Sequence, residues 1–394
     1  MTQAKRVAVV CPRFSETGTV GGAETLLKRL AELLAESGRE VHILTTCATD
    51  HFTWANALPP GRRRVGNLEV HFFPVDERDT AAFHKIQQAI SHRDDVSETD
   101  ERTWIRHSVN SSALYDHLRK HGDEYDRILA GPYLFGVTYA AALIHPGKTW
   151  LVPCLHDEPF AYLGIMRELF SRVAGCLFNS EPERELARTL FPRPDGGGPV
   201  IAMDIAPFEA DSSAFARRHG LSVPYVIYSG RREAGKGTPL LTDYLWAFRQ
   251  RTGQDVRLIL TGSGPVDMPP ELAPFVLDLG FVSEEEKHEA MAGAAVFIHP
   301  SVNESLGIVL LEAWMAGTPA LVHAQSRVLR WQCARSGGGL WFRHYPDFEQ
   351  ELLLLLAQPG LGREMGRKGR DYVRREYARE TIRTRLLAAI EGNK

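Results

Sequence analysis

Two glutamates in the second half of the chain have the type and the spacing to bind vicinal hydroxyl groups. Glu304 and Glu312 lie in the segment Ser301–Pro319, which directly follows the apolar run Val296–His299. The segment predicts a helix from about Ser305 to Ala316. Eight helical positions at about 100° each end about 80° beyond two full turns, so both carboxylates are expected at one edge of the helix N-terminus. Ionised carboxylates there suit sugar and ribose hydroxyls.

A basic loop in the same half of the chain has the charge to bind a diphosphate. The loop Ser229–Gly237 contains Arg231 and Lys236 and follows the expected strand Tyr225–Tyr228. An arginine and a lysine on a glycine-containing loop can neutralise the charge of a departing diphosphate. We assign Arg231 and Lys236 to this role, with Arg232 as the less favoured substitute for Arg231. The alternative is a solvated basic loop.

The first half of the chain offers a glycine loop and a histidine. The loop Gly18–Gly22, with Gly21 and Gly22 at its end, lets backbone approach a ligand closely because no Cβ intervenes. It is not a Gly-x-Gly-x-x-Gly sequence, so a dinucleotide fingerprint is not supported, and a tight turn is the alternative. His156 follows the expected strand Trp150–Val152 and is a candidate for the reacting face, with a purely structural histidine as the alternative.

Two series of apolar runs must position these residues. The runs alternate with helical periodicity, which predicts two parallel sheets with helices on both faces and ligands at the carboxyl ends of the strands. The charged segment 76–125 is predicted to hold helices and loops of uncertain register. The expected strands of the first series are Val7–Val10, Val41–Thr45, Ile128–Ala130, Trp150–Val152 and Cys176–Phe178, and those of the second are Tyr225–Tyr228, Arg257–Leu260, Val276–Leu279, Val296–His299 and Pro319–Val322.

The expected fold class is therefore α/β with two Rossmann-like domains. The first domain is predicted over residues 1–205, a linker over 206–222 and the second domain over 223–370. The segment Leu361–Ile390 reads as two helices, and residues 371–394 are predicted to return to the first domain. Ser180–Glu183 predicts a capping box at the start of a helix.

Composition excludes several classes of protein. The chain has 394 residues with a net charge of −3, which lacks the basic excess that non-specific nucleic-acid binding needs. Its five scattered cysteines form no Cys-x-x-Cys pair, which argues against a disulfide framework and a zinc site. No signal peptide or membrane span is expected, which favours a cytoplasmic protein. The basic stretch Arg363–Arg385 fits either a solvated helix face or peripheral contact with an anionic membrane.

These motifs resemble those of the retaining GT-B glycosyltransferases of the family 4 type, the group related to glycogen and sucrose synthases, over nearly the whole chain. The resemblance implies two domains facing across a cleft, with acceptors bound by the first and a nucleotide-diphosphate sugar by the second. It implies that Glu304 contacts the transferred sugar, Glu312 the ribose, and His156 the donor sugar region. The further donor-binding residues that we place by this resemblance are Gly21, Gly22, Gly262, Val282, Ser305, Leu306 and Gly307.

The implied reaction is metal-independent, front-face transfer of a hexosyl unit to a glycan, lipid-linked or small-molecule hydroxyl. The stretch Cys11–Gly22 contains no histidine that could serve as the base of an inverting enzyme, which favours retention. No Asp-x-Asp sequence suggests a metal-bound diphosphate, so no metal or cofactor is expected. The alternatives are an epimerase or phosphorylase on the same fold, or a non-catalytic sugar-nucleotide-binding protein. The segment His323–Arg327 departs from the family pattern, so acceptor contacts are not carried over.

Overall fold

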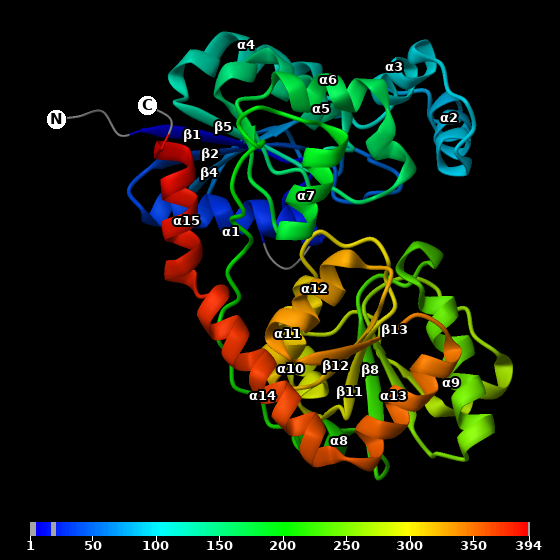
Figure 1. The fold of residues 1–394 in the computed structure, drawn as a ribbon. Helices are drawn as coiled ribbons and strands as arrows, with labels where there is room; N and C mark the ends of the chain where they lie inside the picture. The colour runs from blue at the N-terminus through cyan, green and yellow to red at the C-terminus, as the bar shows by residue number, and fades with distance from the viewer. Residues whose placement is uncertain (1–4, 17–20, 393–394) are drawn as a thin grey trace. The chain divides into compact units, whose positions relative to one another are not determined.

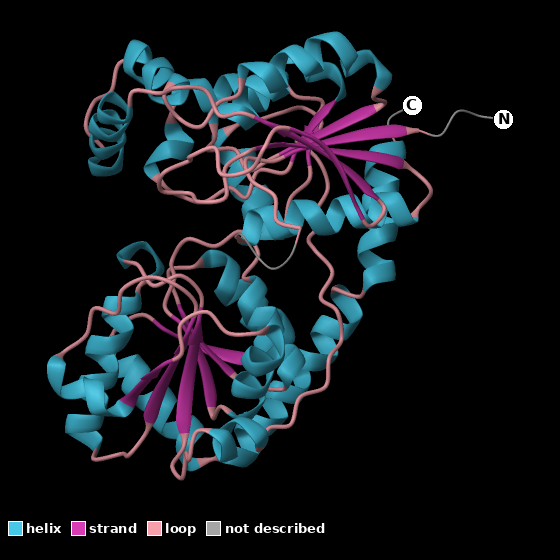
Figure 2. Cartoon of the chain, turned by 180° about the vertical axis from the view of Figure 1, so that it is seen from behind, coloured by secondary structure: helices cyan, strands magenta, loops and turns pink. Residues whose placement is uncertain are grey.

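The computed structural model describes residues 5–16 and 21–392. The chain forms two compact units, one comprising Met1–Met203 with Ile382–Lys394 and the other Asp204–Thr381. Each unit is a central sheet with helices on both of its faces (Figure 1, Figure 2). The expected α/β class with two parallel-sheet domains is confirmed.

The first unit has a seven-stranded sheet in the order β3-β4-β2-β1-β5-β6-β7. All neighbouring strands in it are parallel except β3 and β4, which form a hairpin that the sequence analysis did not predict. The hairpin turns at Gly66, whose φ is 58°. The strands are β1 (Arg6–Val10), β2 (Glu40–Thr46), β3 (Gly61–Val65), β4 (Leu68–Phe73), β5 (Arg127–Ala130), β6 (Thr149–Leu151) and β7 (Gly175–Cys176).

The helices of the first unit begin at well-defined caps. In the charged segment 76–125, Asp79, Ser97 and Ser111 each accept a hydrogen bond from a first-turn backbone N–H, which separates this segment into three helices. The helices are α1 (Gly22–Glu36), α2 (Thr80–His92), α3 (Glu98–Arg106), α4 (Ser112–His121), α5 (Gly136–Ile144), α6 (Gly164–Arg172), α7 (Glu181–Leu190) and α15 (Arg379–Glu391), with 3-10 turns at Gly122–Glu124, Pro146–Lys148 and Pro159–Tyr162.

The second unit has an all-parallel sheet in the order β10-β9-β8-β11-β12-β13. Its strands are β8 (Tyr225–Ser229), β9 (Arg257–Thr261), β10 (Val276–Asp278), β11 (Val296–His299), β12 (Ala320–His323) and β13 (Gly339–Phe342). Its helices are α8 (Ala214–Arg218), α9 (Thr238–Thr252), α10 (Glu284–Gly293), α11 (Ile308–Ala316), α12 (Arg327–Ser336), α13 (Tyr345–Ala357) and α14 (Pro359–Glu376), with 3-10 turns at Ala234–Lys236 and Pro270–Phe275.

One predicted helix start was wrong, and one predicted cap has additional partners. Helix α11 begins at Ile308 rather than at Ser305, because Gly307 takes a left-handed φ of 82° and caps the helix. At the predicted capping box, Ser180 accepts the backbone N–H of Glu183, and the Glu183 carboxylate accepts backbone N–H groups of Ser180, Leu155 and Asn179. Glu183 therefore also connects the start of α7 to the loop after β6.

The last two helices divide between the units. Helix α14 belongs to the second unit, and the chain rejoins the first unit from Ile382, within α15. Among the described residues, no helix is both long and apolar enough to cross a membrane. No disulfide bond links the five cysteines, all of which are described.

Candidate active site

The second unit brings two predicted site loops together at the carboxyl ends of its strands. Strand β8 lies between β9 and β11, and the chain order reverses direction at the β8–β11 pair. The loop after β8 carries Arg231 and Lys236, and the loop after β11 carries Glu304. In open parallel sheets, ligands bind at this switch point because the two loops diverge and leave a crevice.

Lys236 and Glu304 form an ion pair at this point. The ammonium Nζ of Lys236 donates to Oε1 of Glu304 at 2.7 Å, and the two side chains are 23% and 14% exposed. His299, the last residue of β11, places its Nε2 3.3 Å from the same carboxylate oxygen. Burial raises the pKa of Glu304, but the Lys236 charge and the His299 contact outweigh it and hold the pKa well below its usual range. The carboxylate is therefore ionised at neutral pH.

Glycines allow the loops to meet. A Cβ on Gly237, where φ is 73°, would lie 2.7 Å from the carbonyl oxygen of Pro300 in the β11 loop. A Cβ on Gly262, where φ is 114°, would lie 2.1 Å from the carbonyl oxygen of Gly230 in the β8 loop. Both distances are shorter than van der Waals contact, so any side chain at these positions would push the loops apart. Gly262 thus supports the site because it lets the loop after β9 pack directly against the backbone of the loop after β8.

The two adjacent arginines of the β8 loop have different environments. The Arg231 side chain is 49% exposed and lies 3.4 Å from Glu233, while its carbonyl accepts a hydrogen bond from the buried Tyr228 hydroxyl at 2.6 Å. Arg232 is buried and donates to the Gly264 carbonyl at 2.8 Å and to Asp278 at 2.7 Å. Arg232 therefore fastens the β8 loop to its neighbours, and Arg231 stays the candidate for diphosphate.

Glu312 lies in a second ion pair. Its carboxylate is 3.0 Å from Nζ of Lys287 on α10, and both side chains are less than one fifth exposed. Burial raises the pKa of Glu312, and the nearby ammonium of Lys287 offsets only part of this increase. Burial lowers the pKa of Lys287, yet Glu312 and Glu284 raise it above its usual value.

The helical geometry used to align Glu304 with Glu312 is not observed. Glu304 precedes α11, so the angle per helical residue does not apply between them. Within the described part of the chain, Glu312 forms an ion pair with Lys287, whereas Glu304 contacts Lys236 and His299. The two carboxylates therefore have separate environments.

The remaining predicted residues of this unit border the same loops. Leu306 is buried, and its carbonyl accepts a hydrogen bond from Nε2 of Gln332 at 3.3 Å. Ser305 and Gly307 flank it and complete the turn into α11. Val282 is half-buried and directly precedes Ser283, the cap of α10. Their predicted contacts with a donor remain predictions.

In the first unit, Gly21 and Gly22 lead into α1. Gly22 is the first residue of the helix, and a Cβ on Gly21 would lie 2.6 Å from Oε2 of Glu24. Glu24 forms a buried ion pair with Arg13, with NH2 of Arg13 2.7 Å from Oε1 of Glu24. The earlier part of the predicted glycine loop, Gly18–Val20, lies outside the described residues.

His156 lies in the loop after β6, also in the first unit. Its Nδ1 is 3.5 Å from Oε1 of Glu158, which accepts a hydrogen bond from the Tyr133 hydroxyl at 2.9 Å. The buried carboxylate of Glu183 accepts the N–H of Leu155 at 2.7 Å and so fixes the residue before His156. Burial raises the pKa of Glu183 to about 8, although its backbone donors act in the opposite direction.

Four of these residues were not predicted as parts of the site. His299 could have been found, because it is the only polar residue of the strand Val296–His299 and stands at its carboxyl end. Lys287, Glu158 and Glu183 carry no such signal, since their partners come from packing between elements that are distant in sequence or from loop geometry.

Comparison with known proteins assigns this chain to a family. Residues 211–372 match the family model described as glycosyl transferases group 1. The chain is 36% identical over 346 residues to the phosphatidyl-myo-inositol mannosyltransferase of Mycobacterium leprae, covering 82% of this chain and 81% of the relative. It is 34% identical over 125 residues to soluble starch synthase 2-3 of Oryza sativa subsp. indica, and that match covers 28% of this chain and only 15% of the starch synthase.

Solved structures show the same two-domain fold. Sucrose-phosphate synthase from Thermosynechococcus elongatus matches with a TM-score of 0.71 at 17% identity, covering 97% of each chain. Anabaena HepE in complex with UDP and glucose matches with a TM-score of 0.70 at 16% identity, covering 98% of this chain and 100% of that one. The expected GT-B fold is confirmed by these similarities.

Proposed function

Because this chain belongs to the group 1 glycosyltransferases, we propose that it is a retaining enzyme that transfers a hexosyl unit from a nucleotide-diphosphate sugar to a hydroxyl acceptor. The observation that carries the proposal is the Lys236–Glu304 ion pair at the β8–β11 switch point. An ammonium for a diphosphate and an ionised carboxylate for sugar hydroxyls stand side by side there, 2.7 Å apart.

The proposed roles follow from exposure and charge. Arg231 and Lys236 neutralise the diphosphate as it leaves, since Arg231 is half-exposed and both cations lie on one loop. Glu304 accepts hydrogen bonds from the transferred sugar, and Glu312 accepts them from the ribose. His156 is assigned to the donor sugar region, held through the backbone of its loop.

In the proposed step the acceptor oxygen forms a bond to the anomeric carbon from the face that the diphosphate leaves. The bond between this carbon and the diphosphate oxygen breaks, and the departing phosphate takes the bonding electrons and the acceptor proton. No side-chain nucleophile is needed. We also propose that no metal takes part, because Arg231 and Lys236 supply the positive charge.

Support for a nucleotide donor comes from the relatives. HepE was solved with UDP and glucose, and with UDP-glucose. The mannosyltransferase of Mycobacterium leprae and the D-inositol 3-phosphate glycosyltransferase of Pseudarthrobacter chlorophenolicus, 24% identical over 419 residues, are named for inositol-containing acceptors. The acceptor of this chain is proposed to be a glycan, a lipid-linked or a small-molecule hydroxyl.

The first test is thermal unfolding of the full chain with UDP, GDP, ADP and dTDP, followed by the sugar nucleotides of whichever diphosphate raises the melting temperature. Transfer from that donor is then assayed with and without EDTA, and the anomeric configuration of the product is read by NMR. Retention at an unchanged rate in EDTA supports the proposal. An inverted product, or phosphate-dependent turnover, overturns it.

Variants connect the activity to the site. Glu304→Gln and Lys236→Ala are each expected to lower kcat by about 10²–10³, the loss typical of removing one transition-state contact. The matched controls are Glu285→Gln and Lys368→Ala, two exposed residues of the same unit. Nucleotide binding with no turnover of any sugar nucleotide in the parent would favour a non-catalytic binding protein instead.

A further inference from the structure

Among the described residues, one group of three side chains has the ligand atoms to share a metal ion. His42, Glu69 and His71 each offer one such atom, and these atoms lie within 4.8 Å of one another. Nε2 of His71 is 2.6 Å from Oε1 of Glu69, and Nε2 of His42 is 3.8 Å from Oε2 of Glu69. One carboxylate thus stands between two imidazoles. The group belongs to the first unit, and the proposed transfer does not use it.

Strand register explains why these residues meet. In the parallel pair β2–β4, His42 lies opposite Glu69, and Leu44 lies opposite His71. Side chains alternate along a strand, so His42, Glu69 and His71 project from the same face of the sheet. The rigid backbone of two paired strands therefore fixes the three donors.

A buried tyrosine orients the first imidazole. The Tyr125 hydroxyl lies 3.0 Å from Nδ1 of His42 and 3.1 Å from Nε2 of His117. It can donate its proton to His117 and accept the Nδ1–H of His42, which leaves Nε2 of His42 with its lone pair toward the group. Histidine ligands of metals are held in this way, through a hydrogen bond at the other ring nitrogen.

The two imidazoles are buried, and two carboxylates lie beside them. The residues His42 and His71 are only 7% and 3% exposed. Glu40 adds a second carboxylate, with Oε1 3.1 Å from Nε2 of His42. The cations beside the two carboxylates are Arg6, 3.0 Å from Glu40, and Arg62, 3.8 Å from Glu69.

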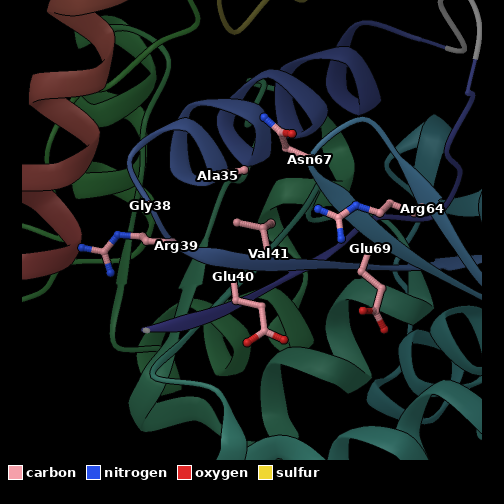
Figure 3. Close-up of a pocket in the computed structure, with 8 residues that line it drawn as sticks. All are labelled: Ala35, Gly38, Arg39, Glu40, Val41, Arg64, Asn67 and Glu69. Carbon is pink, nitrogen blue, oxygen red and sulfur yellow. The ribbon is translucent and has the colours of Figure 1, made fainter. Parts of the chain in front are cut away.

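A recess lies where the amino ends of β2 and β4 meet the end of α1. It has a volume of about 450 Å³, and Glu40 and Glu69 are among its lining residues. Figure 3 shows both glutamate side chains pointing in the same direction from their neighbouring strands, away from Asn67. The side chains of Glu40 and Glu69 are 42% and 40% exposed, so an ion from solvent can reach their carboxylates before it meets the buried imidazoles.

We propose that His42, Glu69 and His71 bind one Zn²⁺. Two imidazoles and a carboxylate are a ligand set that suits zinc, with water or Glu40 as the fourth ligand. Zinc–ligand bonds of about 2.0–2.1 Å place neighbouring donors about 3.4 Å apart. The separation of 2.6 Å from Nε2 of His71 to Oε1 of Glu69, and that of 3.8 Å from Nε2 of His42 to Oε2 of the same carboxylate, would each change by less than about 1 Å to reach this value. The ion would tie β2 to β4 and stabilise the first unit.

The test is equilibrium dialysis of the tag-free full chain against Zn²⁺, followed by elemental analysis. About one zinc per chain is expected, and zinc at about 100 times its Kd should raise the melting temperature by several degrees. Glu69→Gln and His71→Gln should each weaken binding by tenfold or more, as should Tyr125→Phe through lost orientation (about 10–100-fold). The matched controls are Glu124→Gln, whose carboxylate contacts Arg6 and His121 outside the group, and the exposed His84→Gln.

Zinc binding is measured directly, so the result does not depend on whether the chain transfers a sugar. Zinc retained by the controls and lost by Glu69→Gln supports the site. The proposal is overturned if the parent binds no zinc, or if Glu69→Gln and Glu124→Gln bind it equally, since the group is then only a hydrogen-bonded network. Glu69 is partly exposed, so its variant remains informative if His71→Gln fails to fold. The controls also distinguish this site from adventitious surface binding.

Discussion

Replacing Lys236 by methionine tests the ion pair at the centre of the site. The change removes the ammonium 2.7 Å from Glu304 and keeps most of the side-chain volume. The Glu304 carboxylate, 14% exposed, is then left with His299 as its remaining contact among those that lower its pKa. Burial is no longer opposed by the ammonium, so the pKa of Glu304 should rise.

The magnitude lies between two limits. Removing one partner of a fully buried pair costs about 3–5 kcal/mol, whereas an exposed pair contributes about 0–1 kcal/mol. With side chains 23% and 14% exposed, Lys236→Met should lower the stability of the second unit by about 2 kcal/mol. The double variant with Glu304→Gln should recover part of this loss, which gives a coupling of about 1–2 kcal/mol.

Calorimetry of the full chain at several pH values measures the effect, because about 2 kcal/mol shifts the melting temperature by roughly 4–8 °C in a unit of this size. In the parent, the lowered pKa of Glu304 contributes stability above the unfolded carboxyl pKa, and this stability is lost as the pH falls through the folded value. In Lys236→Met that contribution is absent, so parent and variant should converge on acidification. Lys368→Met, from an exposed pair, is the control.

Two results would refute this reasoning. The first is a Lys236→Met protein that melts with the parent from neutral to acidic pH. The second is a double variant that loses as much as the sum of the single variants, because the two side chains would then not interact.

Three further predictions concern the supporting residues. Gly262→Ala should destabilise the second unit and weaken nucleotide binding, whereas Gly235→Ala, with open space around its Cβ, should leave both unchanged in melting and binding assays. Arg231→Met should raise the donor Kd without lowering the melting temperature, whereas Arg232→Met should lower the melting temperature; the reverse result would exchange their roles. Glu183→Gln should lower the free energy of unfolding of the first unit by about 1–3 kcal/mol, because the buried backbone N–H of Leu155 or Asn179 loses its acceptor. Faster hydrogen exchange of one of these two amides would show the loss.

Much of the fold could be predicted because alternation of apolar runs and helical periodicity is a local property. Strands β8, β9 and β11 lie within a residue of their expected bounds. The β3–β4 hairpin was missed because β3, Gly61–Val65, contains Arg62, Arg63 and Arg64 and has no apolar pattern. It is a strand because β4 supplies its backbone partners at the sheet edge.

The site could be predicted only as separate loops. Lys236 and Glu304 are 68 residues apart, and their contact depends on β8 lying next to β11, which the local pattern does not specify. The pairing of Glu312 with Lys287 depends in the same way on the packing of α10 against α11. Sequence periodicity gives the elements, whereas strand order decides which of their ends share a site.

The ion pair also bears on how the proposed enzyme distinguishes donor from product. Lys236 meets an incoming diphosphate while paired with Glu304, so phosphate binding must weaken a contact of 2.7 Å. An intact donor compensates, because the sugar hydroxyls can replace the ammonium as partners of the ionised Glu304. A free nucleoside diphosphate has no transferred sugar, so it leaves the buried Glu304 carboxylate without partners to replace the ammonium. The pair should therefore favour the sugar-bearing donor over the spent nucleotide, which assists product release after transfer.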